Sequence, residues 1–222
     1  MGQTEPYSLS DLYGQRFSAA ERERKNALWK VLCQSFFQKY VTESDVVLDL
    51  GAGYCEFINN IRCDRKFAVD LSEDTQRAAG DDVTVIIKPA TDLSTFEASS
   101  ADVVFASNLF EHLSSKDDLM TVLREVHRVL KPGGKLLVLQ PNIRYAYREY
   151  WDYLDHHLPL SHVSLGEALN LAGFAVREMR PRFLPYSVKS GLPQSTLLLR
   201  LYLLVPPLHL LFGRQMFLLA VR

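Results

Sequence analysis

Residues 46–57 of this 222-residue chain read VVLDLGAGYCEF and constrain the fold more than any other segment. Apolar residues around one acid run into Gly51 and Gly53, and an amphipathic pattern follows. This order predicts a buried strand over 46–50, a tight glycine turn and a helix over 54–62. Such a turn presents backbone N–H groups and the positive end of a helix to a ligand.

The residues around the glycine turn argue against two of its three common ligands. A triphosphate site needs Lys and then Ser or Thr after the last glycine, and 54–62 holds no such pair. A dinucleotide site needs glycine at the sixth position of GxGxxG, where Glu56 stands and would repel a pyrophosphate. S-adenosylmethionine (SAM) has no phosphate and needs only a thin turn, which Gly51, Ala52 and Gly53 supply.

Two further acids stand at the ends of predicted strands. Strand 66–70 ends in Asp70, which follows Asp49 by 21 residues and is placed to accept ribose hydroxyls in a Rossmann-like unit. Strand 83–88 is followed by Asp92, whose carboxylate is placed to accept the amino group of an adenine. Together the two acids fit an adenosine without phosphates.

Five segments carry a resemblance to a known family: VVLDLGAG, AVD, ATDLS, ADVVFASNLFEHL and LREVHRVLKPGGKLLVLQPN. They look like the successive motifs of the class I SAM-dependent methyltransferases, particularly the type 11 group, over residues 46–174. The resemblance implies a doubly wound, mostly parallel, seven-stranded α/β sheet with an antiparallel last strand, and SAM as the cofactor. The family often has a third glycine where this chain has Cys55, which is small enough to keep the turn.

The resemblance also implies cofactor contacts outside the glycine turn. Asn108 would meet SAM near the transferred methyl through its backbone carbonyl. Tyr13 and Arg16 would close over SAM, since an arginine can pair with its carboxylate, although Arg16 is also explained as a surface residue. The cofactor-binding residues that we predict are Tyr13, Arg16, Asp49, Gly51, Ala52, Gly53, Asp70, Leu71, Asp92, Leu93 and Asn108.

The apolar periodicity predicts one domain over 1–222. Its predicted parts are an N-terminal cap helix within 1–44, a cofactor-binding core over 45–142, an acceptor lid over 143–163, and a C-terminal helix and strands over 164–222. Ser18 with Glu21, and Ser164 with Glu167, read as capping boxes that open helices ending near Tyr40 and Gly173. Further expected elements are helices 73–79 and 116–130 and strands 102–107, 135–140, 174–180 and 215–221.

Composition narrows the partners and the compartment. The 25 basic and 26 acidic residues give a net charge of −1, so no overall field favours nucleic acid. The three cysteines show no metal-binding spacing, and no signal peptide precedes them, so we expect reduced thiols in the cytoplasm.

Methyl transfer from a sulfonium is an in-line displacement that needs alignment and, for a hydroxyl acceptor, removal of a proton. Strand 102–107 leads to Asn108, Glu111 and His112. His112 suits a general base, and a structural hydrogen bond to Glu111 or a loop carbonyl is the alternative. Some relatives bind Mg²⁺ through a glutamate where this chain has Asn108, so we expect no metal.

Residues 145–162, YAYREYWDYLDHHLPLSH, mix aromatic, acidic and histidine side chains. Rings beside carboxylates and imidazoles are typical of a sugar or polyol site. His156, His157 and Asp155 are therefore alternative bases, although adjacent side chains make poor metal spacing. A lid whose aromatics only cover the core is equally compatible with this segment.

Residues 197–212, LLLRLYLLVPPLHLLF, are apolar but interrupted, so they do not predict a spanning helix. They fit packing on the sheet edge, a homodimer contact, or a surface that meets a membrane or a lipid-linked acceptor. This tail resembles a bacterial subgroup associated with glycan and lipid-linked saccharide pathways. The sequence thus predicts a SAM-dependent methyltransferase acting on a small or lipid-linked saccharide hydroxyl. The alternatives are an NAD(P)-dependent oxidoreductase and a non-catalytic SAM-binding scaffold.

Overall fold

The computed structural model describes residues 19–186 and 195–222, so Tyr13, Arg16 and Ser18 lie outside the described residues. Seven strands form one sheet in the order β3-β2-β1-β4-β5-β7-β6. The strands are β1 (Val46–Leu50), β2 (Arg65–Asp70), β3 (Val83–Ile87), β4 (Ala101–Ser107), β5 (Leu130–Pro141), β6 (Ala175–Arg180) and β7 (Gln215–Val221). Strands β1 to β5 pair in parallel, and β7 runs antiparallel between β5 and β6. The predicted seven-stranded, mostly parallel sheet is confirmed.

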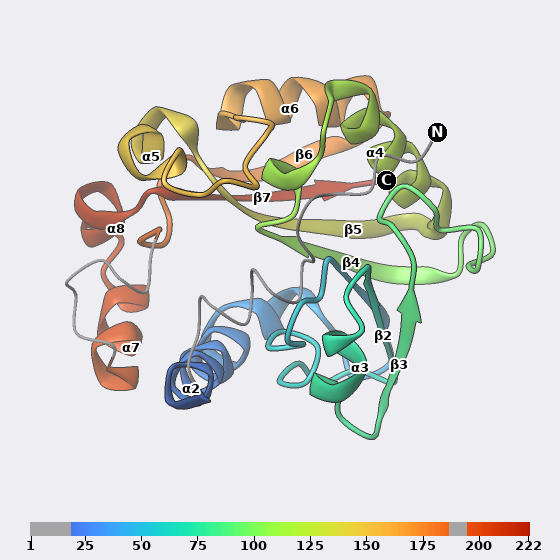
Figure 1. The fold of residues 1–222 in the computed structure, drawn as a ribbon, viewed down its shortest axis with the longest axis horizontal. Coiled ribbons are helices and arrows are strands. Elements are labelled where there is room, and N and C mark those ends of the chain that lie inside the picture. The colour runs from blue at the N-terminus through green and yellow to red at the C-terminus, as the bar shows by residue number, and fades with distance from the viewer. Residues whose placement is uncertain (1–18, 187–194) are drawn as a thin grey trace.

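Helices cover both faces of this sheet, with α4 and α6 on one side and α2 on the other (Figure 1). The helices are α2 (Ala19–Ser35), η1 (Phe37–Tyr40), α3 (Asp74–Ala78), η2 (Phe110–His112), α4 (Lys116–Val129), α5 (Ile143–Tyr150), α6 (His162–Leu171), α7 (Thr196–Leu204) and α8 (Pro206–Phe212). No helix in the two described ranges is both long and apolar enough to span a membrane.

Successive residues of each central strand enter the cores on opposite faces, as the pleat of a strand requires. In β4, Val104 packs in the cluster that contains Val122 of α4. Its neighbour Phe105 packs in the cluster that contains Cys33 of α2. The rings of Phe57 and Phe105 stack there with centroids 3.8 Å apart. This packing on both faces holds the strands in place, and so it fixes the positions of the carboxyl ends of the parallel strands.

The helix predicted over 54–62 is wrong, because this segment forms a run of turns. Cys55 has a φ of 59°, in the left-handed region that a right-handed helix cannot include. The side chain of Asn60 also donates to the backbone carbonyl of Glu56 at 2.8 Å. Such side-chain bonds compete with a regular helix. The glycine turn therefore lacks the helix dipole that the sequence pattern implied.

Two other boundaries differ from the prediction. The capping box of α6 is formed by Ser161 and Ser164, each accepting from the other's backbone N–H, so the proposed pairing of Ser164 with Glu167 is wrong. Ser161 is extended at φ −98° and ψ 162°, as an N-cap should be. Strand β5 begins before residue 135, because Leu130 already pairs with Ala101 ahead of a register shift.

Candidate active site

The two glycines of the turn after β1 differ in what surrounds them. Gly51 has a φ of +72°, and an added Cβ would lie 2.8 Å from Cδ1 of Leu109, just beyond β4. Gly53 has a φ of +51°, and an added Cβ would meet nothing within 4 Å. Gly51 thus allows close contact with the end of β4, whereas Gly53 borders space that a ligand can enter.

Asp70 ties the glycine turn to the end of β2. One carboxylate oxygen accepts the backbone N–H of Gly53 at 2.7 Å, and the other accepts that of Ser72 at 2.8 Å. The next residue, Leu71, leaves 57% of its surface exposed. Asp70 therefore has a fixed orientation, with an apolar side chain beside it against which a flat ring can pack.

Asp92 lies beyond the end of β3. The side chain and backbone of Ser94 and the side chain of Lys88 hold the pKa of its carboxyl well below the ordinary value. The ammonium of Lys88 lies 2.9 Å from it. This carboxylate is ionised at neutral pH and can accept a hydrogen bond from a ligand.

Asp49 and Leu93 are less accessible than a direct cofactor contact requires. Burial and the charges of Glu56 and Asp70 raise the pKa of Asp49, while a backbone hydrogen bond from Ile58 opposes this rise. The side chain of Leu93 is wholly buried, and its carbonyl accepts from a guanidinium at 2.9 Å. The side chain of Asp49 supports the turn, and that of Leu93 packs in the core. Leu93 could therefore contact a ligand only through its backbone.

Asn108 follows β4 in a left-handed conformation, with a φ of 48°. Its backbone N–H donates to Leu139 at 2.9 Å, and its side-chain amide donates to Ser107 at 3.1 Å. The side-chain oxygen is buried and has no hydrogen-bond partner in the described part of the chain. A buried acceptor without a partner is costly unless a ligand supplies a donor. Together with the space at Gly53, this acceptor fits the ammonium and ribose of SAM.

The sequence candidates His112 and His156 come together, with ring centroids 5.1 Å apart. Nδ1 of His112 lies 2.9 Å from the carbonyl and 3.2 Å from the carboxylate of Asp155. Nδ1 of His156 lies 2.8 Å from the carbonyl of Tyr150. The buried Glu111 carboxylate accepts from the side-chain amide of Gln140. Ligand atoms of Glu111, His112 and His156 all lie within 4.8 Å of one another, and we call these three residues the histidine cluster.

The surroundings of the histidine cluster shift its titration. Burial lowers the pKa of His112, but the hydrogen bond that His112 donates to Asp155 and the charges of Glu111 and Asp155 outweigh it and raise the pKa to about 9. Burial raises the pKa of Glu111, against the charge of His112 and its hydrogen bonds. Without a ligand, His112 is therefore positively charged at neutral pH.

His157, the third histidine predicted as a base, has an exposed side chain. Only its backbone contacts the cluster, where its N–H donates to the Glu111 carbonyl at 2.7 Å.

Sequence reasoning missed Gln140 and Tyr186. The hydroxyl of Tyr186 lies 3.5 Å from Nδ1 of His156, and burial with the nearby Glu111 charge raises its pKa. No local motif marks either residue, because only the folded sheet brings them to the cluster.

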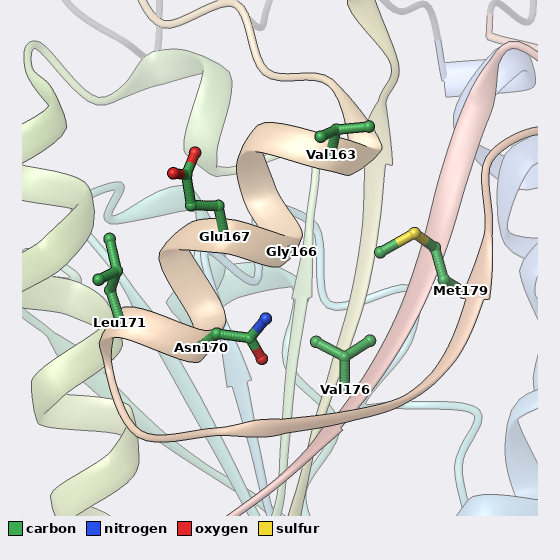
Figure 2. A pocket seen from close by; sticks show the side chains of 7 residues that line it. All are labelled: Val163, Gly166, Glu167, Asn170, Leu171, Val176 and Met179. Atoms are coloured by element: carbon green, nitrogen blue, oxygen red, sulfur yellow. The ribbon is translucent and has the colours of Figure 1, made fainter.

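A separate groove lies between α6 and the edge strand β6 (Figure 2). It is lined by Val163, Gly166, Glu167, Asn170, Leu171, Val176 and Met179. None of these residues belongs to the glycine turn or to the histidine cluster. The groove is therefore distinct from the candidate active site.

Comparison with known proteins agrees with this geometry. A family model described as "Methyltransferase domain" matches residues 48–138. A candidate methyltransferase of Encephalitozoon cuniculi (strain GB-M1) is 28% identical over 132 residues, which are 58% of this chain and 58% of that protein. This chain thus spans less than two thirds of that relative's length.

Solved structures share the fold at low identity. A SAM-dependent methyltransferase from Archaeoglobus fulgidus is 19% identical with a TM-score of 0.66, covering 97% of this chain and 100% of that one. One from Mesorhizobium loti is 19% identical with a TM-score of 0.60, covering 88% and 98%. A candidate methyltransferase solved with the Haloferax volcanii Trm112 activator is 19% identical with a TM-score of 0.70, covering 97% and 98%. Residues 48–138 therefore resemble a methyltransferase domain, and the chain shares the fold of solved SAM-dependent methyltransferases.

Proposed function

We propose that this chain transfers a methyl group from SAM to an oxygen atom of a small or lipid-linked acceptor, with a saccharide hydroxyl as the preferred candidate. The observation that carries the proposal is the contact between the glycine turn and the end of β4. Gly51 packs against Leu109, which lies in the chain between Asn108 and the first two residues of the histidine cluster. A cofactor held at the turn would therefore have its methyl group facing buried, hydrogen-bonding side chains.

SAM supplies a methyl group on a positively charged sulfur, and the protein has to align that group with the acceptor. In our proposal the glycine turn of Gly51, Ala52 and Gly53 admits the methionine part and the ribose. Asp70 accepts the ribose hydroxyls, and Asp92 accepts the adenine amino group. Leu71 and Asn108 complete the site, and Asp49 and Leu93 support it from behind. The contacts of Tyr13 and Arg16 remain predictions.

The segment after β5 offers both buried and exposed rings to an acceptor. Tyr150 and Tyr153 have ring centroids 4.7 Å and 4.9 Å from that of His156. Tyr147 and Trp151, in contrast, leave 54% and 60% of their surface exposed. Part of this segment therefore fills the core, as the covering-lid interpretation requires, and part is available to pack on the C–H face of a sugar.

A hydroxyl acceptor has to lose its proton as the methyl group arrives. His112 is protonated at neutral pH in the ligand-free chain, so it is better placed to donate a hydrogen bond than to accept this proton. In the tautomer that donates from Nδ1 to Tyr150, His156 has an Nε2 that can accept a proton. We therefore rank His156 ahead of His112 as the base, and His157 last because its side chain is exposed.

The tail over residues 197–212 supports the proposal of a lipid-linked acceptor. Helix α7 packs through Leu199 and Tyr202 on the core beneath α2. Its other face and α8 leave Leu197, Leu198, Leu201, Leu204, Val205, Leu210, Leu211 and Phe212 exposed. We propose that this apolar face, with the exposed Arg200, contacts a membrane surface.

Pelleting with anionic vesicles tests this membrane contact. We expect the native chain to pellet with the vesicles and Leu204→Glu to pellet less. A homodimer through the same face would instead appear in sedimentation without lipid.

The two alternatives make different predictions. A dinucleotide would place its pyrophosphate beside Glu56, whose carboxylate lies 2.9 Å from the ammonium of Lys25. One carboxylate oxygen of Asp70 also accepts the backbone N–H of Gly53, so a donor that a pyrophosphate would need is already in use. A non-catalytic scaffold would bind SAM but leave an acceptor unchanged.

Transfer of a radiolabelled methyl group tests the proposal. Native chain and an Asp70→Ala variant would be incubated with labelled SAM and a cell extract of saccharide intermediates. We expect label in the saccharide fraction with the native chain and at least about tenfold less with the variant, since one carboxylate hydrogen bond is worth about 1.5–3 kcal/mol. Asp117→Asn, at an exposed position of α4, serves as the matched control and should keep full activity. Label no higher with the native chain than with Asp70→Ala would support the scaffold.

A further inference from the structure

We propose that Glu111, His112 and His156 form a binding site for a divalent first-row transition metal ion, with Zn²⁺ as the favoured occupant. From sequence no metal is expected, because Asn108 stands where some relatives have a metal-binding glutamate and because Asp155, His156 and His157 are adjacent in one segment. The fold instead takes one histidine from that segment and joins it to two residues after β4. It thus builds a three-donor set that no local spacing reveals.

The distances allow such a site after small side-chain movements. The three donor atoms lie within 4.8 Å of one another. Ligands at about 2.0–2.1 Å from a tetrahedral zinc ion are about 3.3 Å apart, so rotations at the ends of these side chains suffice. Glu111 and His156 are buried, and His112 is mostly so, which holds each group near its position.

The hydrogen bonds behind the two imidazoles are those that metal-binding histidines usually make. A histidine ligand commonly donates its second ring N–H to a carboxylate or a backbone carbonyl, which fixes its tautomer and its direction. His112 makes this contact through Nδ1 to Asp155, and His156 makes it through Nδ1 to Tyr150. In both rings Nε2 is then the nitrogen for the metal. Gln140 orients the Glu111 carboxylate in the same way.

Buried charge and an orphaned hydroxyl give an independent reason to expect a cation. Glu111 is 1% exposed and Asp155 is 6% exposed, so two carboxyl groups leave water together. A divalent ion would balance both charges once it has displaced the proton from His112. The Tyr150 hydroxyl is also buried without a hydrogen-bond partner among the described residues, and the charge of Glu111 acts on it. A metal-bound water is a suitable partner for that hydroxyl.

The donor types select the metal. Two imidazoles and one carboxylate suit Zn²⁺ and its first-row neighbours, whereas Mg²⁺ and Ca²⁺ prefer sites made only of oxygen. Three protein ligands also leave one position open, as in catalytic zinc sites. An acceptor hydroxyl bound at that position would have a lower pKa, so the ion would take over the role of a base. This last consequence rests on the proposed function, but binding of the ion does not.

Co²⁺ titration of the untagged full chain tests the site, because tetrahedral Co²⁺ absorbs visible light. After dialysis against a chelator, we expect one equivalent of Co²⁺ to give visible bands that added Zn²⁺ removes. His156→Ala and the milder Glu111→Gln should each weaken binding at least about tenfold. Asp155→Asn should weaken it by about 10–100-fold, the usual effect of losing such a supporting hydrogen bond. His157→Ala changes a neighbouring exposed histidine and should bind as the native chain does.

Two results would overturn the site. One is the absence of visible bands in the native chain. The other is Co²⁺ binding that His157→Ala weakens as much as His156→Ala, with both variants unfolding at the native temperature. Calorimetry of the metal-depleted chain with S-adenosylhomocysteine separates failure of the metal site from failure of the proposed function. The cofactor turn shares no residue with the cluster, so the metal site can fail while the cofactor still binds.

Discussion

Nδ1 of His112 lies 3.2 Å from a carboxylate oxygen of Asp155, linking the end of β4 to the segment that follows β5. This pair, with the Glu111 charge, raises the pKa of His112 from 6.5 to about 9 even though burial opposes the rise. In Asp155→Asn, we expect the pKa to fall back towards 6.5, since a neutral amide supplies neither the charge nor the same hydrogen bond. Proton NMR titration of the metal-free chain measures both values.

The same pair predicts how stability changes with pH. Because the folded pKa of His112 is the higher one, its contribution to stability is complete below pH 6.5 and is lost as pH rises through about 9. The native chain should therefore lose its advantage over Asp155→Asn between these values, as followed by urea unfolding. A constant difference from pH 6 to pH 10 would contradict the assignment.

The two glycines of the turn should respond oppositely to alanine. Gly51→Ala places a Cβ at 2.8 Å from Leu109 at a φ of +72°, so we expect a loss of about 2 kcal/mol or more in the free energy of unfolding. Gly53→Ala meets no atom within 4 Å and should cost only the strain of its φ, about 1 kcal/mol. Its methyl group would enter the cofactor space, so Gly53→Ala should weaken S-adenosylhomocysteine binding more than it weakens the fold. Chemical unfolding and calorimetry on both variants check this pair.

Glu178 of β6 should support the fold only above acidic pH. Burial raises the pKa of Glu178, but hydrogen bonds from Tyr40 and Arg180, with the charges of Arg180 and Lys39, lower it overall. The hydroxyl of Tyr40 donates to it at 2.7 Å. A lowered pKa means that this stabilisation is present above about pH 4.5 and is lost as pH falls through the folded value. We expect Glu178→Gln to cost about 1 kcal/mol at pH 7 and less near pH 3. An equal cost at both pH values would show that packing, not charge, is lost.

The doubly wound, mostly parallel sheet could be anticipated from sequence, because short apolar segments with acids at their ends alternated with helical patterns in the way that the family resemblance implied. The turns over 54–62 could not. Phe57, Ile58 and Ile61 are buried there, as one face of a helix would be, so the apolar pattern is the same for both structures. The difference is the left-handed φ of Cys55, and the spacing of apolar residues in the sequence does not indicate such a backbone angle.

The candidate site divides in the same way. Gly51, Gly53 and Asp70 could be predicted because each lies at the end of a strand or in the short turn after it, where local sequence determines the geometry. The meeting of His112 with His156 depends on how the segment after β5 folds back, and the backbone bonds from His157 and Leu158 to the Glu111 carbonyl that hold it there leave no sequence signal. Sequence therefore named both histidines as separate candidates but could not place them in one cluster.

The most direct test of the account is calorimetry of the native chain with S-adenosylhomocysteine and, separately, with NADH. We predict micromolar or tighter binding of S-adenosylhomocysteine in a one-to-one complex. We predict no binding of NADH, because Glu56 stands where a dinucleotide site needs glycine and Asp70 already accepts the N–H of Gly53. Tight binding of NADH with no heat from S-adenosylhomocysteine would contradict it.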